Sequence, residues 1–177
     1  MGEIGRILMQ PMQAGSPPAS LPAAAQAGET FWVLGSLNTI KVREASYTLL
    51  ESAAPPGDLR GGVGGMPPHA HHAQEEAVYV LQGEYALVVG GVELRLSPGS
   101  FASVPRGTVH AFRVTGSEPG RCLVILTPPG PTERFFEEVG VPVADGTPIA
   151  PPRDLPDMER FLASARKNGI ELLTTPV

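Results

Sequence analysis

The chain has 177 residues, a formal net charge of −5 and a hydrophobic fraction of 42%. This length suits one globular domain with one core. A mildly acidic chain without a basic run is not typical of proteins that bind nucleic acid or anionic membranes. No apolar stretch approaches the roughly 18 residues that a membrane span needs. We therefore expect a cytoplasmic protein with neither nucleic acid nor membrane among its partners.

Residues 1–30 are rich in proline, alanine and glycine and predict an extended N-terminal arm. Residues 31–130 contain short apolar segments closed by glycine or proline, the pattern of an antiparallel sandwich or barrel. The expected strands are 31–35, 39–42, 46–51, 76–81, 85–89, 92–96, 101–104, 108–114 and 121–127. The glycine-rich stretch 55–65 is expected to be a loop.

Two helical patterns end the chain. The first covers 132–139, with Thr132 as the expected N-cap. The second covers 157–167 and places Met158, Phe161, Leu162 and Ala165 on one face. We expect residues 131–177 to form a short helical extension that packs outside the barrel.

Three histidines and one glutamate have the pattern of a metal site. In a strand, His69 and His71 point to the same side, and Glu76 opens the next predicted strand. With His110 they offer three nitrogens and one oxygen, a set that suits Fe, Ni, Mn, Co or Zn. His72 should face away. The residues alone leave open a plain polar strand face, with His110 as a structural histidine.

The spacing around these ligands resembles the two signature motifs of the cupin superfamily. The first runs His69-X-His71, four residues, Glu76, six residues, Gly83; the second runs Gly99, five residues, Pro105-X-Gly107, two residues, His110. A wider resemblance extends to single-domain, quercetinase-like bacterial cupins. It implies a double-stranded β-helix in which the three motif histidines and the glutamate hold one divalent transition metal.

The resemblance also implies an activity. It indicates a metal-dependent dioxygenase that acts on a small enol, phenol or flavonol-like substrate, with Glu76 as ligand and as base for the substrate hydroxyl. One alternative is a non-catalytic module that binds a metal or a small molecule. Another is a sugar isomerase or epimerase, which would need more arginine and lysine in its pocket to bind phosphate.

Strand alternation predicts which side chains line the pocket. Val78 and Val80 share a face with Glu76, and Phe112 and Val114 share a face with His110. We expect these four apolar residues to form the pocket wall, and the alternative is that they are plain barrel core. The family often has asparagine at the position of Val114, so this interior should be drier and favour an apolar or aromatic ligand. Open edge strands predict a homodimer.

Overall fold

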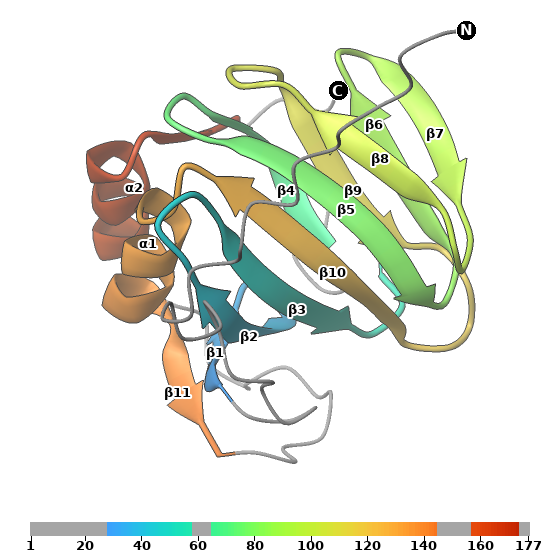
Figure 1. The fold of residues 1–177 in the computed structure, drawn as a ribbon, viewed down its shortest axis with the longest axis horizontal. Helices are drawn as coiled ribbons and strands as arrows, with labels where there is room; N and C mark the ends of the chain where they lie inside the picture. The colour runs from blue at the N-terminus through green and yellow to red at the C-terminus, as the bar shows by residue number, and fades with distance from the viewer. Residues whose placement is uncertain (1–27, 58–64, 145–156, 174–177) are drawn as a thin grey trace, which may run out of the picture.

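The computed structural model describes residues 28–57, 65–144 and 157–173. Strands dominate this part of the chain and form two antiparallel sheets that face each other, with two helices at one side (Figure 1). This arrangement confirms the predicted all-β fold class with helices outside. Within the described residues, no helix has the length and apolar character required to cross a membrane.

The larger sheet contains seven strands. They are β1 (Glu29–Val33), β2 (Ser36–Arg43), β3 (Thr48–Ala54), β5 (Glu75–Gln82), β8 (Phe101–Val104), β10 (Gly120–Thr127) and β11 (Val141–Val143). Their order across the sheet is β11-β1-β2-β3-β10-β5-β8. Strands that lie far apart in the sequence are therefore neighbours in this sheet, for example β11 and β1, or β3 and β10.

The smaller sheet contains five strands. They are β4 (Gly65–His71), β6 (Tyr85–Val89), β7 (Val92–Leu96), β9 (His110–Val114) and β12 (Ile170–Leu172). Their order is β12-β4-β9-β6-β7, so the histidine-bearing strands β4 and β9 are neighbours. This pairing places the two predicted motifs side by side.

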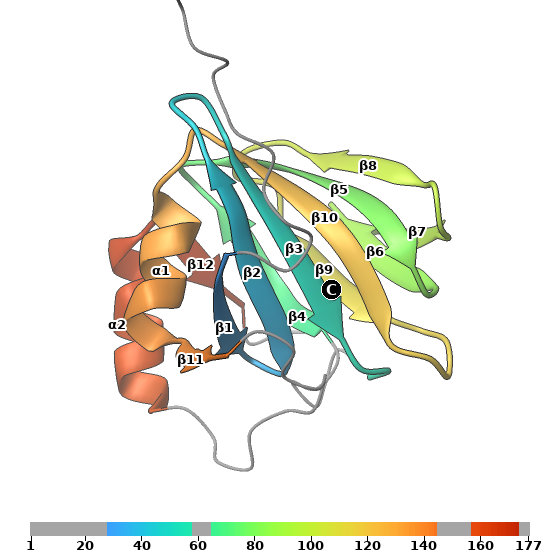
Figure 2. The ribbon, with the colours of Figure 1, turned by 60° about the horizontal axis from the view of Figure 1, so that its bottom comes forward.

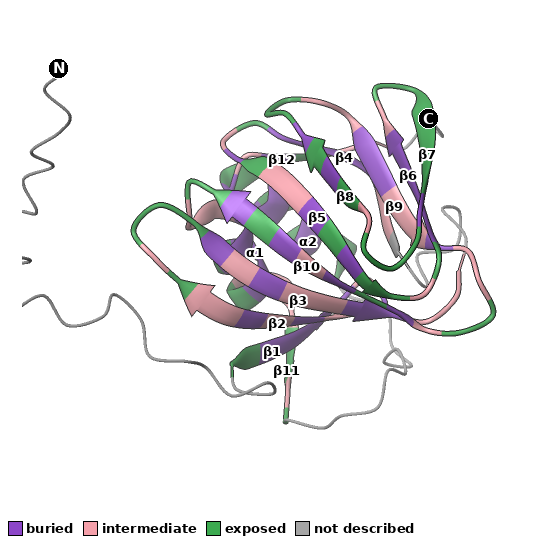
Figure 3. Ribbon diagram, turned by 45° about the vertical axis from the view of Figure 1, so that its right-hand side comes forward, coloured by how far each residue is buried: buried purple, intermediate pink, exposed green. Residues whose placement is uncertain are grey.

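The core lies between the sheets, and in strands such as β8 and β10 burial alternates as the pleat requires (Figure 3). In β10, for example, Cys122 and Leu126 are buried while Arg121 and Ile125 are exposed. Aliphatic side chains fill most of the interior, and each fully buried one contributes about 1.5–3 kcal/mol. Val78, Val80 and Val114 belong to this core.

The helices α1 (Pro131–Val139) and α2 (Met158–Lys167) pack beside each other at one end of the sheets (Figure 2). Phe135 of α1 and Phe161 of α2 meet edge to face, with ring centroids 5.0 Å apart, and both are fully buried. Asp157 caps α2 by accepting hydrogen bonds from the backbone N–H groups of Glu159 and Arg160. Aromatic packing therefore joins the two helices, and both rings belong to the same buried cluster as the core residues of the strands.

The prediction that Thr132 caps the first helix is wrong. The helix begins at Pro131 with Gly130 as its N-cap, and the Glu133 carboxylate accepts the Gly130 backbone N–H at 2.8 Å. The Thr132 hydroxyl instead donates to Gln74 at 2.6 Å, so it is not available for capping. The hydroxyl expected to cap the start of the helix is thus directed to Gln74, between β4 and β5.

Two short strands late in the chain were not predicted. β11 and β12 have three residues each, too few to show an alternating pattern, and they join the larger and the smaller sheet respectively. Residues 131–177 are therefore not only helical, and β1 begins at Glu29, inside the predicted arm. Most of that arm and residues 58–64 of the predicted loop lie outside the described residues. The division into arm, barrel and extension stays a prediction.

Candidate metal centre

The four predicted ligands come from three neighbouring pieces of backbone. His69 and His71 lie on β4, and His69 pairs across to His110 at the start of β9. Glu76 lies on β5 in the facing sheet. The ligand atoms of all four side chains lie within 4.8 Å of one another. The structure thus brings these residues together at one end of the barrel interior.

The distances within the cluster are short. His69 Nε2 and His71 Nε2 are 3.1 Å apart, and His71 Nε2 is 3.2 Å from Glu76 Oε2. His110 Nε2 is 3.6 Å from the same carboxylate oxygen. All three histidines are buried, whereas His72 is exposed and lies outside the cluster. A single ion is small enough to contact all four atoms.

The outer ring nitrogens determine the direction of the lone pairs. His69 Nδ1 donates to the carbonyl oxygen of Pro67 at 2.8 Å, and His110 Nδ1 donates to that of Thr108 at 3.0 Å. Because a backbone carbonyl only accepts, each ring in its neutral form keeps its proton on Nδ1 and presents the Nε2 lone pair to the centre. His110 Nε2 is fully buried and has no hydrogen-bond partner. Nitrogen acceptors that converge on one point, one of them without a hydrogen-bond partner, are the arrangement expected around a bound cation.

The charges of the cluster depend on one another. Burial raises the pKa of Glu76, but the neighbouring His110 and His71 outweigh it and hold that pKa well below its ordinary value. Burial lowers the pKa of His110, and Glu76 overcomes this effect and raises it. Burial, together with the charges of His110 and His71, lowers the pKa of His69 well below its ordinary value. Glu76 is thus ionised and His69 neutral at neutral pH, the forms in which each can bind a metal.

A cavity of about 60 Å³ opens beside the cluster. Its volume exceeds the roughly 10–15 Å³ that one water molecule needs, so there is room for small ligands next to an ion. Besides His69, His71 and Glu76, its wall consists of Asn38, Leu50, Ser52, Met66, Phe112, Cys122, Val124, Leu126, Thr132, Phe135, Phe136 and Ile170. Among the lining residues that the structure describes, Glu76 is the only carboxylate.

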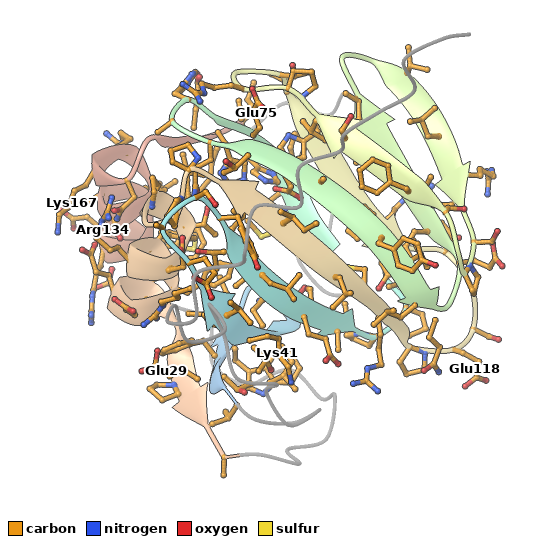
Figure 4. All side chains as sticks on the ribbon, in the orientation of Figure 1. Glu29, Lys41, Glu75, Glu118, Arg134 and Lys167 are labelled. Atoms are coloured by element: carbon orange, nitrogen blue, oxygen red, sulfur yellow. The ribbon has the colours of Figure 1, made fainter. Side chains whose placement is uncertain are left out.

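The four predicted pocket residues occupy different places. Phe112 lines the cavity. Val78, Val80 and Val114 are buried in the core and are not among the residues that line it. Whether these three valines approach a bound substrate stays a prediction. The neighbour of Glu76, Glu75, is exposed at the beginning of β5 (Figure 4).

Sequence reasoning missed several residues of the site. Gln74 is 1% exposed and lies between the two groups of ligands, yet its hydrogen bonds reach Pro128 and Thr132, far along the chain. Phe135 and Ile170 reach the cavity from α1 and β12. Nothing in the local sequence indicates that a polar residue in a turn, such as Gln74, is buried. Phe135 lies in the predicted helix 132–139, but its spacing along the sequence does not show that it reaches the cavity.

The segment that contains both motifs is similar to known proteins. Residues 58–126 match the model of the Cupin domain family. The chain is 30% identical to a quercetin 2,3-dioxygenase of Bacillus subtilis over 102 residues, which are 58% of this chain and 28% of that protein. A quercetin 2,3-dioxygenase of Aspergillus japonicus is 31% identical over 107 residues, 58% of this chain and 29% of the relative. The chain thus spans less than a third of the length of either relative.

Solved structures support the fold. A predicted oxalate decarboxylase of Thermotoga maritima superimposes with a TM-score of 0.53 at 14% identity, covering 60% of this chain and 98% of that one. An RmlC-like cupin of Shewanella frigidimarina gives a TM-score of 0.52 at 19% identity, covering 60% of this chain and 89% of that one. At such identities the likeness concerns the fold alone, and it confirms the predicted double-stranded β-helix.

Proposed function

Because residues 58–126 match the Cupin domain family and two quercetin 2,3-dioxygenases share part of the chain, we propose that it is a cupin that acts as a metal-dependent dioxygenase on a small enol or phenol. His69, His71, Glu76 and His110 would hold one divalent transition metal, Fe, Ni, Mn, Co or Zn. The observation that carries the proposal is the convergence of three imidazole nitrogens and one carboxylate oxygen within 4.8 Å, beside an apolar cavity. The names of the relatives supply the reaction class.

The side chains of this protein would perform binding and proton transfer. A bound divalent ion would supply a Lewis-acidic centre for the substrate hydroxyl and for O₂. Glu76 is the carboxylate of the cluster and, when ionised, would accept the proton of that hydroxyl at Oε2. Because its pKa is low in this cluster, transfer would require the carboxylate to loosen from the bound ion. Phe112 and Phe135 would exclude water from the bound ring.

The cavity favours a small substrate. Its volume of about 60 Å³ is small for a flavonol, since pockets for drug-sized ligands measure about 300–1,000 Å³. Its wall is mostly aliphatic and aromatic. Among the described lining residues there is neither lysine nor arginine, which argues against a sugar phosphate. A sugar isomerase or epimerase is therefore the weaker alternative.

Oxygen consumption tests the proposal. The purified chain, loaded in turn with each of the five metals, is supplied with small catechols, enols and one flavonol while O₂ is recorded. We expect uptake with at least one metal, lost in Glu76→Gln and retained in Glu75→Gln, since Glu75 is exposed. Metal and ligand binding without oxygen uptake across the panel would instead establish the alternative of a non-catalytic binding module.

Two further expectations stand as proposals beside this function. A homodimer is expected because, among the described residues, the sheets end in edge strands, β8 and β11 in one sheet and β7 and β12 in the other. A cytoplasmic location is expected from the composition. Sedimentation of the purified chain tests the first, and fractionation of the source cells tests the second.

A further inference from the structure

We propose that Gln74 and Thr132 form a hydrogen-bond relay that fixes the tautomer of His71. The relay holds the ring proton on Nδ1, so that the Nε2 lone pair faces the other three ligands. The inference rests on the proposed function only where it names a metal as the partner of Nε2. The relay itself consists of atoms of this chain, and its test is therefore separable from that of the metal.

The orientation of the Gln74 amide is the first step. The side chain is 1% exposed and lies between two backbone groups. Its Nε2 donates to the carbonyl oxygen of Pro128 at 2.7 Å, and its Oε1 accepts the backbone N–H of Thr132 at 3.0 Å. Because a backbone carbonyl cannot donate and a backbone N–H cannot accept, only one orientation of the amide satisfies both groups.

The Thr132 hydroxyl follows from that orientation. It donates to Gln74 Oε1 at 2.6 Å, which uses its single proton. Toward His71 Nδ1, at 3.4 Å, the same oxygen can therefore only accept. The proton between them must come from His71, which places it on Nδ1. The backbone at the start of α1 thereby determines the tautomer of a ligand on β4.

This relay has a consequence for the site. In the other tautomer, His71 Nε2–H would donate to Glu76 Oε2, which is 3.2 Å away, and both atoms would be lost as metal ligands. His69 and His110 are held by backbone carbonyls and cannot be released by a side-chain change. His71 is the one ligand of the cluster whose outer nitrogen meets a side chain. Gln74 and Thr132 are thus positioning residues.

Three variants separate the relay from general packing. Thr132→Val removes the hydroxyl at nearly constant volume, and Thr132→Ser restores a hydroxyl. Thr48→Val is the matched control, since Thr48 is also buried and its hydroxyl also donates to the first turn of α1, at Glu133. The tautomers are measured by long-range ¹⁵N–¹H spectra of the metal-free proteins, in which His71→Gln identifies the His71 signal among the four histidines of the chain.

We expect His71 to carry its proton on Nδ1 in the wild type, in Thr132→Ser and in Thr48→Val, and to shift toward Nε2–H in Thr132→Val. Competition titration with zinc and a chromophoric chelator should show about 10- to 100-fold weaker binding in Thr132→Val alone. An Nε2–H tautomer in the wild type, an unchanged tautomer in Thr132→Val, or equal losses in Thr132→Val and Thr48→Val would overturn the relay. If the wild type binds no zinc, the proposed function fails, while the spectra still decide the relay.

Discussion

Replacement of Glu76 by glutamine tests the charge balance of the metal centre. The amide keeps the shape of the side chain but removes the charge that lies 3.2 Å from His71 Nε2 and 3.6 Å from His110 Nε2. Two unit charges about 4 Å apart attract by about 4 kcal/mol at an effective dielectric constant near 20. A divalent ion at such a distance attracts the carboxylate more strongly than a single charge does. The free-energy cost of dehydrating the carboxylate offsets part of this attraction.

The expected loss of affinity translates into a thermal shift. We expect the variant to bind a divalent metal at least about 100-fold more weakly, which is about 2.7 kcal/mol. At a metal concentration about 100 times the wild-type Kd, binding stabilises the wild type by about 2.7 kcal/mol and the variant by about 0.4 kcal/mol. For a domain of this size, the difference corresponds to a Tm response smaller by about 5–9 °C.

Thermal unfolding with and without metal measures this difference. The proteins are stripped with a chelator, dialysed, and melted across a metal titration. Glu75→Gln is the matched control, because it removes a neighbouring exposed carboxylate of the same strand. A Tm response to metal in Glu76→Gln as large as in the wild type would refute the reasoning. Equal losses in both glutamine variants would show a general charge effect.

Other predictions concern pH, glycine geometry and packing. In the metal-free protein Glu76 has a lowered pKa and His110 a raised one, from ordinary values of 4.5 and 6.5. Stability from the glutamate is lost as pH falls below about 4.5 toward its folded pKa, and stability from the histidine is lost as pH rises from about 6.5 through its folded pKa. Urea denaturation should therefore show the largest gap between wild type and Glu76→Gln between these values; a gap that is flat with pH would contradict the ion pair. Gly83→Ala should cost more than the about 1–2 kcal/mol of left-handed backbone, since φ is +82° and a Cβ would lie 2.8 Å from a backbone atom. Gly99→Ala, at φ +90° with open space, should cost only the backbone part, and equal costs in denaturant would contradict the steric account. Phe135→Ala should cost about 3–5 kcal/mol, because it removes a fully buried ring, and a loss below about 1 kcal/mol in the same assay would show that the helix does not depend on it.

The sequence predicted the parts of this protein that depend on local rules. Alternation along a strand places His69 and His71 on one side, and Gly83 and Gly99, the glycines of the two motifs, have the positive φ that glycine readily adopts in turns. These rules need only neighbouring residues and a known period. That is why the strands from β5 to β10 were largely anticipated and the motif residues meet in the structure.

Long-range contacts could not be predicted in the same way. β12 pairs with the histidine-bearing strand β4 across about a hundred residues, with Ile170 opposite His71. Thr132 has the chemistry of a helix cap, and only the position of Gln74 turns its hydroxyl toward the cluster. Parity alone puts Val78 on the interior face, but an interior position can be core or cavity wall. Whether such a residue packs in the core or lines the cavity depends on the neighbouring strands and helices, and the sequence of one strand does not show this.

Elemental analysis tests the central claim most directly. Three proteins are expressed in cells supplied with the five candidate metals and purified without chelator: the wild type, His110→Ala and the control His72→Ala. His110 lies in the cluster, whereas His72 is exposed and paired with Glu171. We predict about one divalent ion per chain in the wild type and in His72→Ala, and far less in His110→Ala. Equal metal in all three proteins, or none in the wild type, would contradict the account.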